Sequence, residues 1–349
     1  MDRVDVSLRE LKTTVDATAR GGAVRAQVTS INLKKTKTDK DYLEVVLNDG
    51  SDSITLRLWL DHPLFPVAQR LTARTWVEVS GDWTQNQYGL DLRPGSKLQV
   101  LDDSEAAELL AGPADVRRRQ AEDFQFIAST VADLADPRLR AVSRRFLDVY
   151  GDRFRRTAAA RDYHHARRGG LVEHVAQMMR SAAALASAYP TLNRDLLLAG
   201  VLFHDCGKLW ENCFQADGFI MPFEERGELL GHITIGIELV NRLWREVVES
   251  GEAAGWESLV PATEEVRLHL LHLIASHHGE IAFGSPVVPK TPEAIVLHHV
   301  DNIDAKLEMI SEGYATSPAL AKNVFERRRP LTGNLVRPLP VVEETSDPS

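Results

Sequence analysis

The residues with the clearest chemical potential are the pair His204-Asp205, which ends the apolar run Val201–Phe203. An imidazole nitrogen and a carboxylate oxygen that are adjacent in sequence can hold or bridge a divalent metal ion. Gly207 follows as a possible helix C-cap, and Lys208 could meet an anion such as phosphate. The dipeptide alone is weak support, because His-Asp pairs occur by chance, so its meaning depends on the residues that accompany it.

Further potential ligands recur through the C-terminal half, on apolar faces or at the ends of expected helices: His174, His232, His277, His278 and Asp301. An unpaired polar group among apolar neighbours is costly, and a lone histidine there is more often a core residue than a ligand. Five separate helical sites reverse that preference, because metal ligation would satisfy all of them together. The remaining histidines are expected to be core or surface residues: His269, His272, His298 and His299.

Mixed imidazole and carboxylate ligands suit Mn, Fe, Co, Ni or Zn. Such an ion lowers the pKa of bound water, and two ions about 4 Å apart can clamp the attacking and leaving oxygens of a phosphodiester. The only cysteines are Cys206 and Cys213, so neither a thiolate zinc site nor a disulfide framework is indicated. The pattern therefore favours hydrolysis of a phosphate ester.

The elements that must position these residues are mostly helical. Residues 169–322 are expected to form one all-α domain, with helices at 171–188, 196–204, 227–248, 261–278 and 292–310. Residues 102–168 are also helical and charged, and they should form a connector packed on that domain. Residues 323–349 hold several prolines and polar residues and are expected to be a mobile tail.

The N-terminal third follows a different pattern. Residues 1–20 form a loose lead-in or a short helix, and residues 21–101 contain short alternating segments. Five strands are expected, at 23–28, 42–47, 53–60, 75–81 and, as the fifth, 89–92 with 98–101, and Asn48-Asp49-Gly50 is a turn signal. Five short strands in this length suit a small β-barrel of the OB type.

This barrel carries candidate nucleic-acid contacts. They are the loop lysines Lys34, Lys35 and Lys37, the strand residues Tyr42, Arg57 and Trp59, and Trp83 and Tyr88 on a later turn. Proteins that bind single strands combine such cations with aromatic stacking platforms. The alternative, which composition alone favours, is that Trp59 and Trp76 are barrel core and the lysines a solvated loop. Residues 20–100 hold 11 Lys and Arg against 9 Asp and Glu, which leaves both interpretations open.

Composition sets outer limits. The 349 residues suit two or three domains, and a net charge of −9 argues against a protein that coats nucleic acid with its whole surface. A local basic groove or a carboxylate-rich metal site remains compatible with that charge. No apolar run approaches the roughly 20 residues that cross a bilayer, and the first residues lack a signal-peptide pattern. We therefore expect no membrane partner and a cytoplasmic location.

The order His174, His204-Asp205, Asp301 resembles the HD-domain metal-dependent phosphohydrolase superfamily. A finer set of motifs, at residues 164–174, 230–233, 276–286 and 301–305, resembles the YhaM family of 3′-to-5′ exoribonucleases. That family joins an N-terminal OB domain to a C-terminal HD domain, and the resemblance covers residues 20–320. It implies a multidomain α and β protein, with a five-stranded OB-type barrel followed by an all-α HD domain.

The resemblance also implies roles for single residues. One divalent ion would be held by His174, His204, Asp205 and Asp301, and Asp205 would bridge to a second ion held by His232, His277 and His278. Asp205 and Lys208 would be catalytic, with Lys208 steadying the scissile phosphate. His165, Arg167 and Arg168 would touch substrate, with a cap or surface role as the alternative. Mn²⁺ is the expected ion, with Co²⁺, Fe²⁺, Ni²⁺ or Zn²⁺ as alternatives.

The expected activity is metal-dependent 3′-to-5′ exonucleolytic hydrolysis of single-stranded RNA to nucleoside monophosphates, with single-stranded DNA as a further candidate substrate and the oligomeric state left open. One alternative is a phosphohydrolase acting on free or cyclic nucleotides. The HD enzymes that cleave cyclic dinucleotides carry Gly-Tyr-Pro after their paired histidines, and residues 279–286 lack it here. The other alternative is a non-catalytic nucleic-acid-binding adaptor, which would need no metal.

Overall fold

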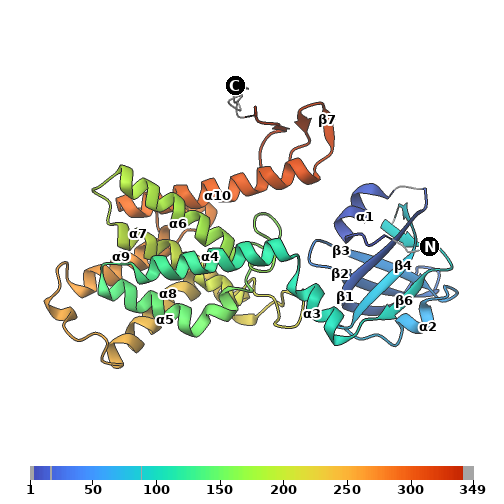
Figure 1. The fold of residues 1–349 in the computed structure, drawn as a ribbon, viewed down its shortest axis with the longest axis horizontal. Helices are drawn as coiled ribbons and strands as arrows, with labels where there is room; N and C mark the ends of the chain where they lie inside the picture. The colour runs from blue at the N-terminus through green and yellow to red at the C-terminus, as the bar shows by residue number, and fades with distance from the viewer. Residues whose placement is uncertain (1–3, 16–17, 88, 341–349) are drawn as a thin grey trace, which may run out of the picture.

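The computed structural model describes residues 4–15, 18–87 and 89–340, and it places an antiparallel sheet domain before a helical domain (Figure 1). The first domain contains α1 (Leu8–Thr14), β1 (Arg20–Lys35), β2 (Asp41–Asn48), β3 (Ser53–Trp59), α2 (Phe65–Ala68), β4 (Trp76–Asn86), β5 (Gly89–Leu92) and β6 (Lys97–Val100). The second domain is entered through α3 (Asp103–Ala111), which lies between the two domains in Figure 1.

The long strand β1 pairs with β4 along its first half and with β2 along its second half. Its order is β3-β2-β1-β4-β5, with β6 also paired to β4, and β1 shifts register between Val28 and Ser30. The end strands β3 and β5 approach within 8 Å of each other, so the sheet forms a half-barrel. Alternating burial along β2 sends one face into the core. The expected fifth strand is in fact two strands, β5 and β6, which both pair with β4. A curled antiparallel sheet is confirmed, and the assignment to the OB type stays a prediction.

The lead-in is part of the sheet domain. Ser7 caps α1 through its side chain, and Leu8 and Leu11 are completely buried in the core of the sheet. The short helix was expected, but the loose alternative is wrong for this segment, because two leucines one turn apart give it an apolar face to bury.

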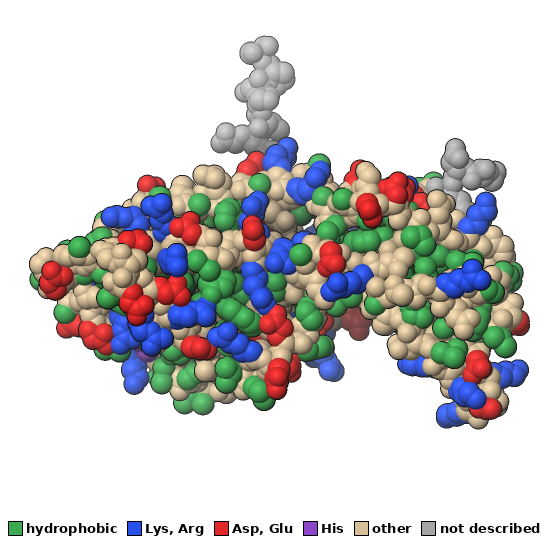
Figure 2. Space-filling view, turned by 90° about the horizontal axis from the view of Figure 1, so that it is seen from below, with side chains coloured by type: hydrophobic (Ala, Val, Ile, Leu, Met, Phe, Trp, Pro, Cys, Tyr) green, Lys and Arg blue, Asp and Glu red, His purple; other side chains and the backbone are tan. Residues whose placement is uncertain are grey.

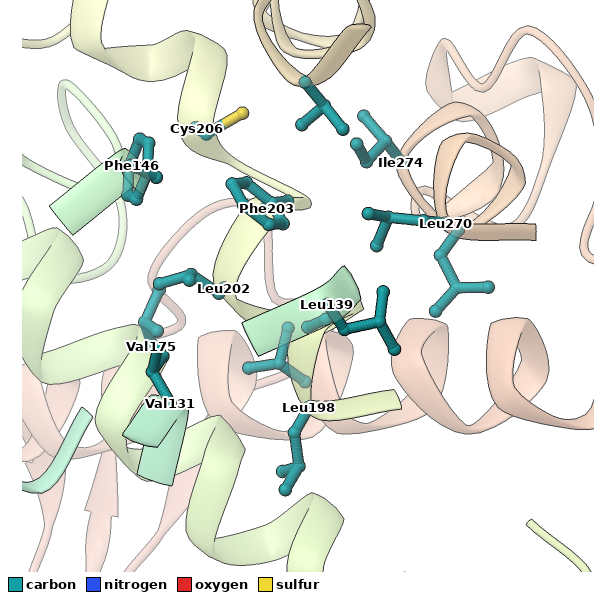
Figure 3. Close-up of a cluster of buried hydrophobic side chains, with 14 of the residues drawn as sticks. Val131, Leu139, Phe146, Val175, Leu198, Leu202, Phe203, Cys206, Leu270 and Ile274 are labelled. Carbon is teal, nitrogen blue, oxygen red and sulfur yellow. The ribbon is translucent and has the colours of Figure 1, made fainter. Parts of the chain in front are cut away.

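The helical domain has one hydrophobic core (Figure 3). Its helices are α4 (Ala114–Ala132), α5 (Pro137–Phe154), α6 (Gly170–Ala188), α7 (Arg194–Phe203), α8 (Glu225–Glu249), α9 (Thr263–Ser276) and α10 (Pro292–Thr316), with short 3₁₀ turns η1 (Cys206–Trp210), η2 (Trp256–Ser258) and η3 (Ile281–Phe283). Phe146 of α5 and Val131 of α4 join this core beside Phe203 of α7. The segment expected to be a connector therefore packs on the later helices and contributes to their core.

The segment expected to be a mobile tail begins with ordered structure. Strands β7 (Ala319–Ala321), β8 (Val324–Phe325) and β9 (Leu335–Val336) form a small antiparallel sheet. Phe325 and Leu335 are buried, and Leu335 lies against Gly313 of α10. The expectation of mobility stays a prediction, although buried apolar side chains hold part of residues 323–340 against the helical domain, and residues 341–349 lie outside the described residues.

The two domains meet through the loop that precedes α8. Gln27 of β1 is fully buried; its side-chain oxygen accepts from the Phe219 N–H at 2.9 Å, and its side-chain nitrogen donates to the Asp217 carbonyl at 3.0 Å. The rings of Trp76 and Phe219 pack edge to face, 5.4 Å apart. In the part of the chain that the structure describes, no helix is long and apolar enough to cross a membrane.

Candidate metal centre

The His-Asp pair lies where a buried helix ends. Every residue of α7 from Leu196 to Phe203 is buried, so the helix passes through the core and carries its C-terminus to the centre of the domain. His204 ends α7, and Asp205 lies between it and η1. Both side chains are buried. A charged carboxylate in such a position requires compensating partners.

His232 reaches the same place because α8 is broken by a glycine. Gly231 has φ +69°, which separates a first turn from the rest of the helix. The backbone of His232 then passes so close to η1 that a Cβ on Gly207 would lie 1.9 Å from the His232 carbonyl oxygen. Gly207 was expected as a helix C-cap; the structure places it inside η1, where it permits this close approach.

The other candidate ligands come from three further helices. His174 lies in the second turn of α6, His277 and His278 follow the last residue of α9, and Asp301 is in the middle of α10. The pair His277-His278 lies at the end of a helix, whereas His174 and Asp301 lie on helix faces. Residues that are far apart in the sequence can therefore converge when these helices pack together.

Four of the histidine side chains approach Asp205. Asp205 Oδ2 lies 3.3 Å from His204 Nε2 and 3.9 Å from His174 Nε2. Asp205 Oδ1 lies 3.6 Å from both His232 Nε2 and His277 Nε2. Two groups of potential ligand atoms lie around Asp205, one formed by His174, His204 and Asp205 and one by His232, His277 and His278; a third group among the described residues consists of His165, His174 and Asp304. Asp301 Oδ1 lies 3.4 Å from His174 Nε2, and His278 Nε2 lies 3.3 Å from His232 Nε2.

The histidine rings are oriented by their other nitrogen. Nδ1 lies 2.8 Å from the backbone carbonyls of Val201, Ile274 and Phe283 in His204, His277 and His278, respectively. In His174 and His232, Nδ1 instead faces carboxylates, at 2.7 Å from Asp304 and 3.1 Å from Glu211. A carbonyl acceptor requires the ring proton on Nδ1, which leaves Nε2 with a lone pair directed at the centre.

Those lone pairs lack partners. His174 Nε2, His204 Nε2, His277 Nε2 and Asp205 Oδ1 are buried without a hydrogen bond. An unsatisfied buried polar atom is costly, and several facing one another as acceptors are costlier still. One or two divalent cations would satisfy the whole set, and the donor types suit a transition metal. The residues present therefore fit a metal ion. On the face in Figure 2, histidine side chains are almost absent from the surface, as this burial requires.

The electrostatics of the centre favour positive charge. Burial disfavours the charged form of Asp205, but Lys208 and His204 outweigh it and hold the pKa of this carboxyl well below its usual range. Burial also opposes the charged form of His174, yet the neighbouring carboxylates of Asp301 and Asp304 prevail and raise its pKa to about 9. Burial lowers the pKa of His277 and His278, which keeps both rings neutral near pH 7.

Lys208 lies at the centre with the ligands. Its Nζ is 2.6 Å from Asp205 Oδ2, and its side chain is only 12% exposed. A buried ammonium beside a carboxylate is held in place, and it is available to an anionic oxygen that enters the site. The geometry therefore suits the expected contact with phosphate.

The three residues expected to touch substrate have other partners. His165 is buried, with Nε2 2.9 Å from Asp304, and Arg167 pairs with Glu173 and Glu308. Through these carboxylates, His165 and Arg167 help to position His174. Arg168 donates to backbone carbonyls of the loop before α8, including Gln215 at 2.7 Å and Ala216 at 3.1 Å, and lines a different cleft. The expectation of direct substrate contact finds no support for any of the three.

Three supporting residues were missed. Asp304 and Glu211 orient His174 and His232, and Asp304 lies one helical turn after Asp301, a spacing visible in the sequence. His164 was included in a motif without a role; its ring lies 5.7 Å from that of His174. Its Nδ1 is buried without a partner, and burial together with the Lys208 charge lowers its pKa to about 3. No sequence signal identifies Glu211.

The remaining histidines lie outside both ligand groups: His269, His272, His298 and His299. His298 supports the site indirectly, since its Nδ1 lies 2.9 Å from the His277 carbonyl oxygen. The Lys290 N–H donates to His272 Nε2 at 3.0 Å. These roles agree with the expectation that the four are packing or surface residues.

The candidate nucleic-acid contacts of the sheet separate into two groups. Trp83 is fully buried and donates its indole N–H to the Gly22 carbonyl, so its expected stacking role is wrong. Tyr42 and Trp59 are cross-strand neighbours with ring centroids 5.0 Å apart, and Trp59 is 40% exposed. Tyr88 lies outside the described residues.

The cationic candidates of the sheet are at its surface but mostly paired. Lys34 and Arg57 both contact Glu44, and Lys35 pairs with Asp39. Lys37 is exposed in the loop between β1 and β2. The basic loop therefore carries less uncompensated charge than its sequence suggests.

Comparison with known proteins agrees with this site. Residues 171–306 match a family model described as HD domain. This part of the chain is therefore similar to an HD domain. The match includes His174, His204, Asp205 and Asp301, and it supports a metal-dependent phosphohydrolase. The finer resemblance to an exoribonuclease family stays a prediction.

Two solved structures resemble parts of the chain. One is RecG bound to a three-way DNA junction, with 20% identity, a TM-score of 0.24, and coverage of 30% of this chain and 13% of that one. The other is the replication factor A related protein from Methanobacterium thermoautotrophicum, with 15% identity, a TM-score of 0.22, and coverage of 29% and 93%. At these scores the similarities carry no functional argument.

Proposed function

We propose that this chain is a divalent-metal-dependent 3′-to-5′ exonuclease that hydrolyses single-stranded RNA, and single-stranded DNA as a second substrate, to nucleoside monophosphates. The observation that carries the hydrolytic part is the convergence of four histidine Nε2 atoms on Asp205, with a fifth, that of His278, beside His232 Nε2; each ring is held through Nδ1. The direction of digestion rests on the resemblance of residues 164–174 and 276–286 to the exoribonuclease motifs.

In this proposal, the ligands are His174, His204, Asp205 and Asp301 for one ion and Asp205, His232, His277 and His278 for a second, with Mn²⁺ as the first candidate. When bound, such ions supply an activated water and stabilise charge on phosphoryl oxygens. Asp205 remains anionic because Lys208 and His204 hold its pKa down. Lys208 is placed to contact a non-bridging oxygen of the scissile phosphate, and Glu211 and Asp304 keep two ligand rings oriented.

Exposed aromatic residues beside the centre support a nucleotide polymer as substrate. Phe283 is 62% exposed, and its carbonyl accepts from His278 Nδ1. Phe223 is 72% exposed and lies 4.0 Å under the guanidinium of Arg161, which also donates to the Glu211 carbonyl. Tyr163 is half-exposed and precedes His164. Aromatic faces paired with a cation are suited to stack on unpaired bases.

The test uses full-length protein with Mn²⁺ and single-stranded 20-nucleotide RNAs labelled at either end. We expect stepwise shortening of 5′-labelled RNA and immediate release of labelled mononucleotide from 3′-labelled RNA. Asp205→Asn should reduce the rate at least 100-fold, while Glu249→Gln, an exposed change on α8, should leave it unchanged. RNA left intact by the wild type, or cleavage that survives Asp205→Asn, would contradict the proposal. Faster turnover of mononucleotides than of RNA would favour the nucleotide phosphohydrolase instead.

A further inference from the structure

A cleft of about 510 Å³ lies on the helical domain, and its lining includes none of the metal-centre residues. Four arginines line it: Arg117 from α4, Arg155 and Arg156 from the end of α5, and Arg168 from the segment before α6. The only carboxylate in the lining is Asp152. Ala216 also belongs to the lining, so the cleft adjoins the loop that contacts the sheet domain through Gln27.

Two of the four arginines, Arg156 and Arg168, are half-buried, and neutral backbone carbonyls hold their guanidinium groups in place. Arg168 donates to the carbonyls of Gln215 and Ala216, and Arg156 donates to those of Asp152 and Phe214, at 2.7–3.2 Å. Carbonyl oxygens orient a guanidinium but do not neutralise its charge. Burial, followed by the charge of Arg156, lowers the pKa of Arg168, and the smaller opposing effect of Asp217 does not cancel this.

The other two arginines, Arg117 and Arg155, are exposed and available to a ligand. The side chain of Arg117 is exposed and has no hydrogen-bond or ion-pair partner among residues 4–15, 18–87 and 89–340. Arg155 is exposed and lies 4.8 Å over the ring of Phe124, and it too has no carboxylate partner in that part of the chain. The Phe124 contact restricts the Arg155 side chain without using its hydrogen-bond donors.

We propose that this cleft binds phosphate groups, at a site separate from the metal centre. The ligand chemistry is that of a polyphosphate or phosphodiester chain, supplied either by the backbone of a single-stranded nucleic acid or by a free nucleotide. Guanidinium groups match phosphate oxygens through paired N–H donors, and four of them around one cleft suit several phosphates. The cleft has the size of a small-ligand site, and it concentrates positive charge in a chain of net charge −9.

The experiment measures binding to the full chain in EDTA, so that phosphates held by metal do not contribute. The probes are a fluorescent 12-nucleotide RNA, a nucleoside triphosphate and pyrophosphate. The test variant is Arg117→Gln with Arg155→Gln, two exposed positions. The matched control is Arg118→Gln with Arg144→Gln, also one change on α4 and one on α5; both control arginines are exposed, and neither lines the cleft.

We expect the test variant to raise the Kd of at least one probe tenfold or more, while the control stays within twofold of the wild type. Weaker RNA binding, together with a slope of log Kd against log salt concentration that is smaller by about two, would identify the nucleic-acid backbone as the ligand. Weaker binding of triphosphate and pyrophosphate, with RNA unaffected, would identify the free nucleotide. No probe binding to the wild type, no change in the test variant, or an equal loss in the control would overturn the proposal.

Discussion

The orientation of each histidine ring of the centre depends on a second residue, which contacts Nδ1 and not the candidate ligand atom Nε2. Three rings are held by backbone carbonyls, which no side-chain substitution removes, but His174 and His232 are held by Asp304 and Glu211. A carboxylate in this position fixes the ring and increases the basicity of the ligating nitrogen. The two carboxylate-held rings are therefore the ligands most sensitive to mutation of their surroundings.

We expect Glu211→Gln to weaken metal binding 10–100-fold while the protein stays folded, because the amide can retain one hydrogen bond but not the charge that supports His232. Titration with Mn²⁺, followed by elemental analysis after dialysis, measures this. Glu238→Gln is the control, since Glu238 pairs with the surface residue Arg226. Metal affinity equal to that of the wild type would show that Glu211 does not position His232.

The ligands were predictable from sequence where their residue type is itself informative. The His-Asp pair after an apolar run and the His-His pair at a helix end became informative because further histidines and acids recur on separate helical segments. The residues that orient the ligand rings were harder to predict. Glu211 looks like any surface acid, and only the three-dimensional path of α8 brings it to His232. Trp83 shows the opposite error, because an aromatic residue on a strand can face either side of a sheet.

Among the elements, α8 decides whether the second ligand group forms. Its first turn and its body are joined at Gly231, whose positive φ lets the chain turn over Gly207. Helix periodicity predicted α8 as one continuous segment from 227 to 248, since glycine within a helical pattern does not by itself announce a kink. The tail strands and the split of β5 from β6 were missed for a related reason, because very short segments give too few residues to establish a period.

We expect Gly231→Ala to destabilise the protein by about 1–2 kcal/mol, the cost of a left-handed conformation at a residue with a Cβ, and to lower the bound-metal stoichiometry by displacing His232. Gly251→Ala is a matched control: it has φ +86°, lies just after α8, and has open space around it. Thermal unfolding should show similar losses for both variants. Elemental analysis should show a metal loss only for Gly231→Ala, and an equal loss in both would contradict the argument.

The start of α5 contributes stability that depends on pH. Asp136 caps the helix and pairs with the buried Arg138 at 2.7 Å. Burial disfavours the charged form of Asp136, but Arg138 outweighs it and lowers the pKa of Asp136. A carboxyl whose pKa is lowered on folding stabilises the protein fully above its unfolded pKa of about 3.9, and this contribution disappears as the pH falls through that region.

We therefore expect Asp136→Asn to destabilise the protein by roughly 2–4 kcal/mol at pH 7, because it leaves Arg138 buried without its counter-charge. The difference from the wild type should begin to shrink as the pH falls below about 4, where the carboxyl of the unfolded wild type becomes protonated, and it should vanish only below the lowered pKa of the folded protein. Denaturant unfolding at pH 7, 5 and 3.5 measures it. A difference independent of pH would mean that the ion pair contributes nothing beyond the cap.

At the scale of the whole molecule, the sheet domain and the helical domain meet at the loop that precedes α8. Phe219 is 9% exposed, packs on Trp76 of the sheet, and belongs to the same connection that follows Lys208 and Glu211. Sequence reasoning predicted both domains but not this contact, because Phe219 lies in an irregular loop with no periodicity to interpret. If the sheet domain holds the strand while the helical domain cleaves it, this contact should matter for long substrates and not for short ones.

We expect Phe219→Ala to lower kcat/KM for a 20-nucleotide RNA at least tenfold. The kcat/KM for a dinucleotide should stay within twofold of the wild-type value. Removing a buried phenylalanine costs about 3–5 kcal/mol of packing, which here lies between the domains rather than within either core. Val67→Ala, a change at an exposed position of the sheet domain, is the control. Initial rates with both substrates measure the effect. Equal losses for the two lengths would show that the mutation damages the metal centre, and no loss for either would show that the sheet domain does not help to hold the strand.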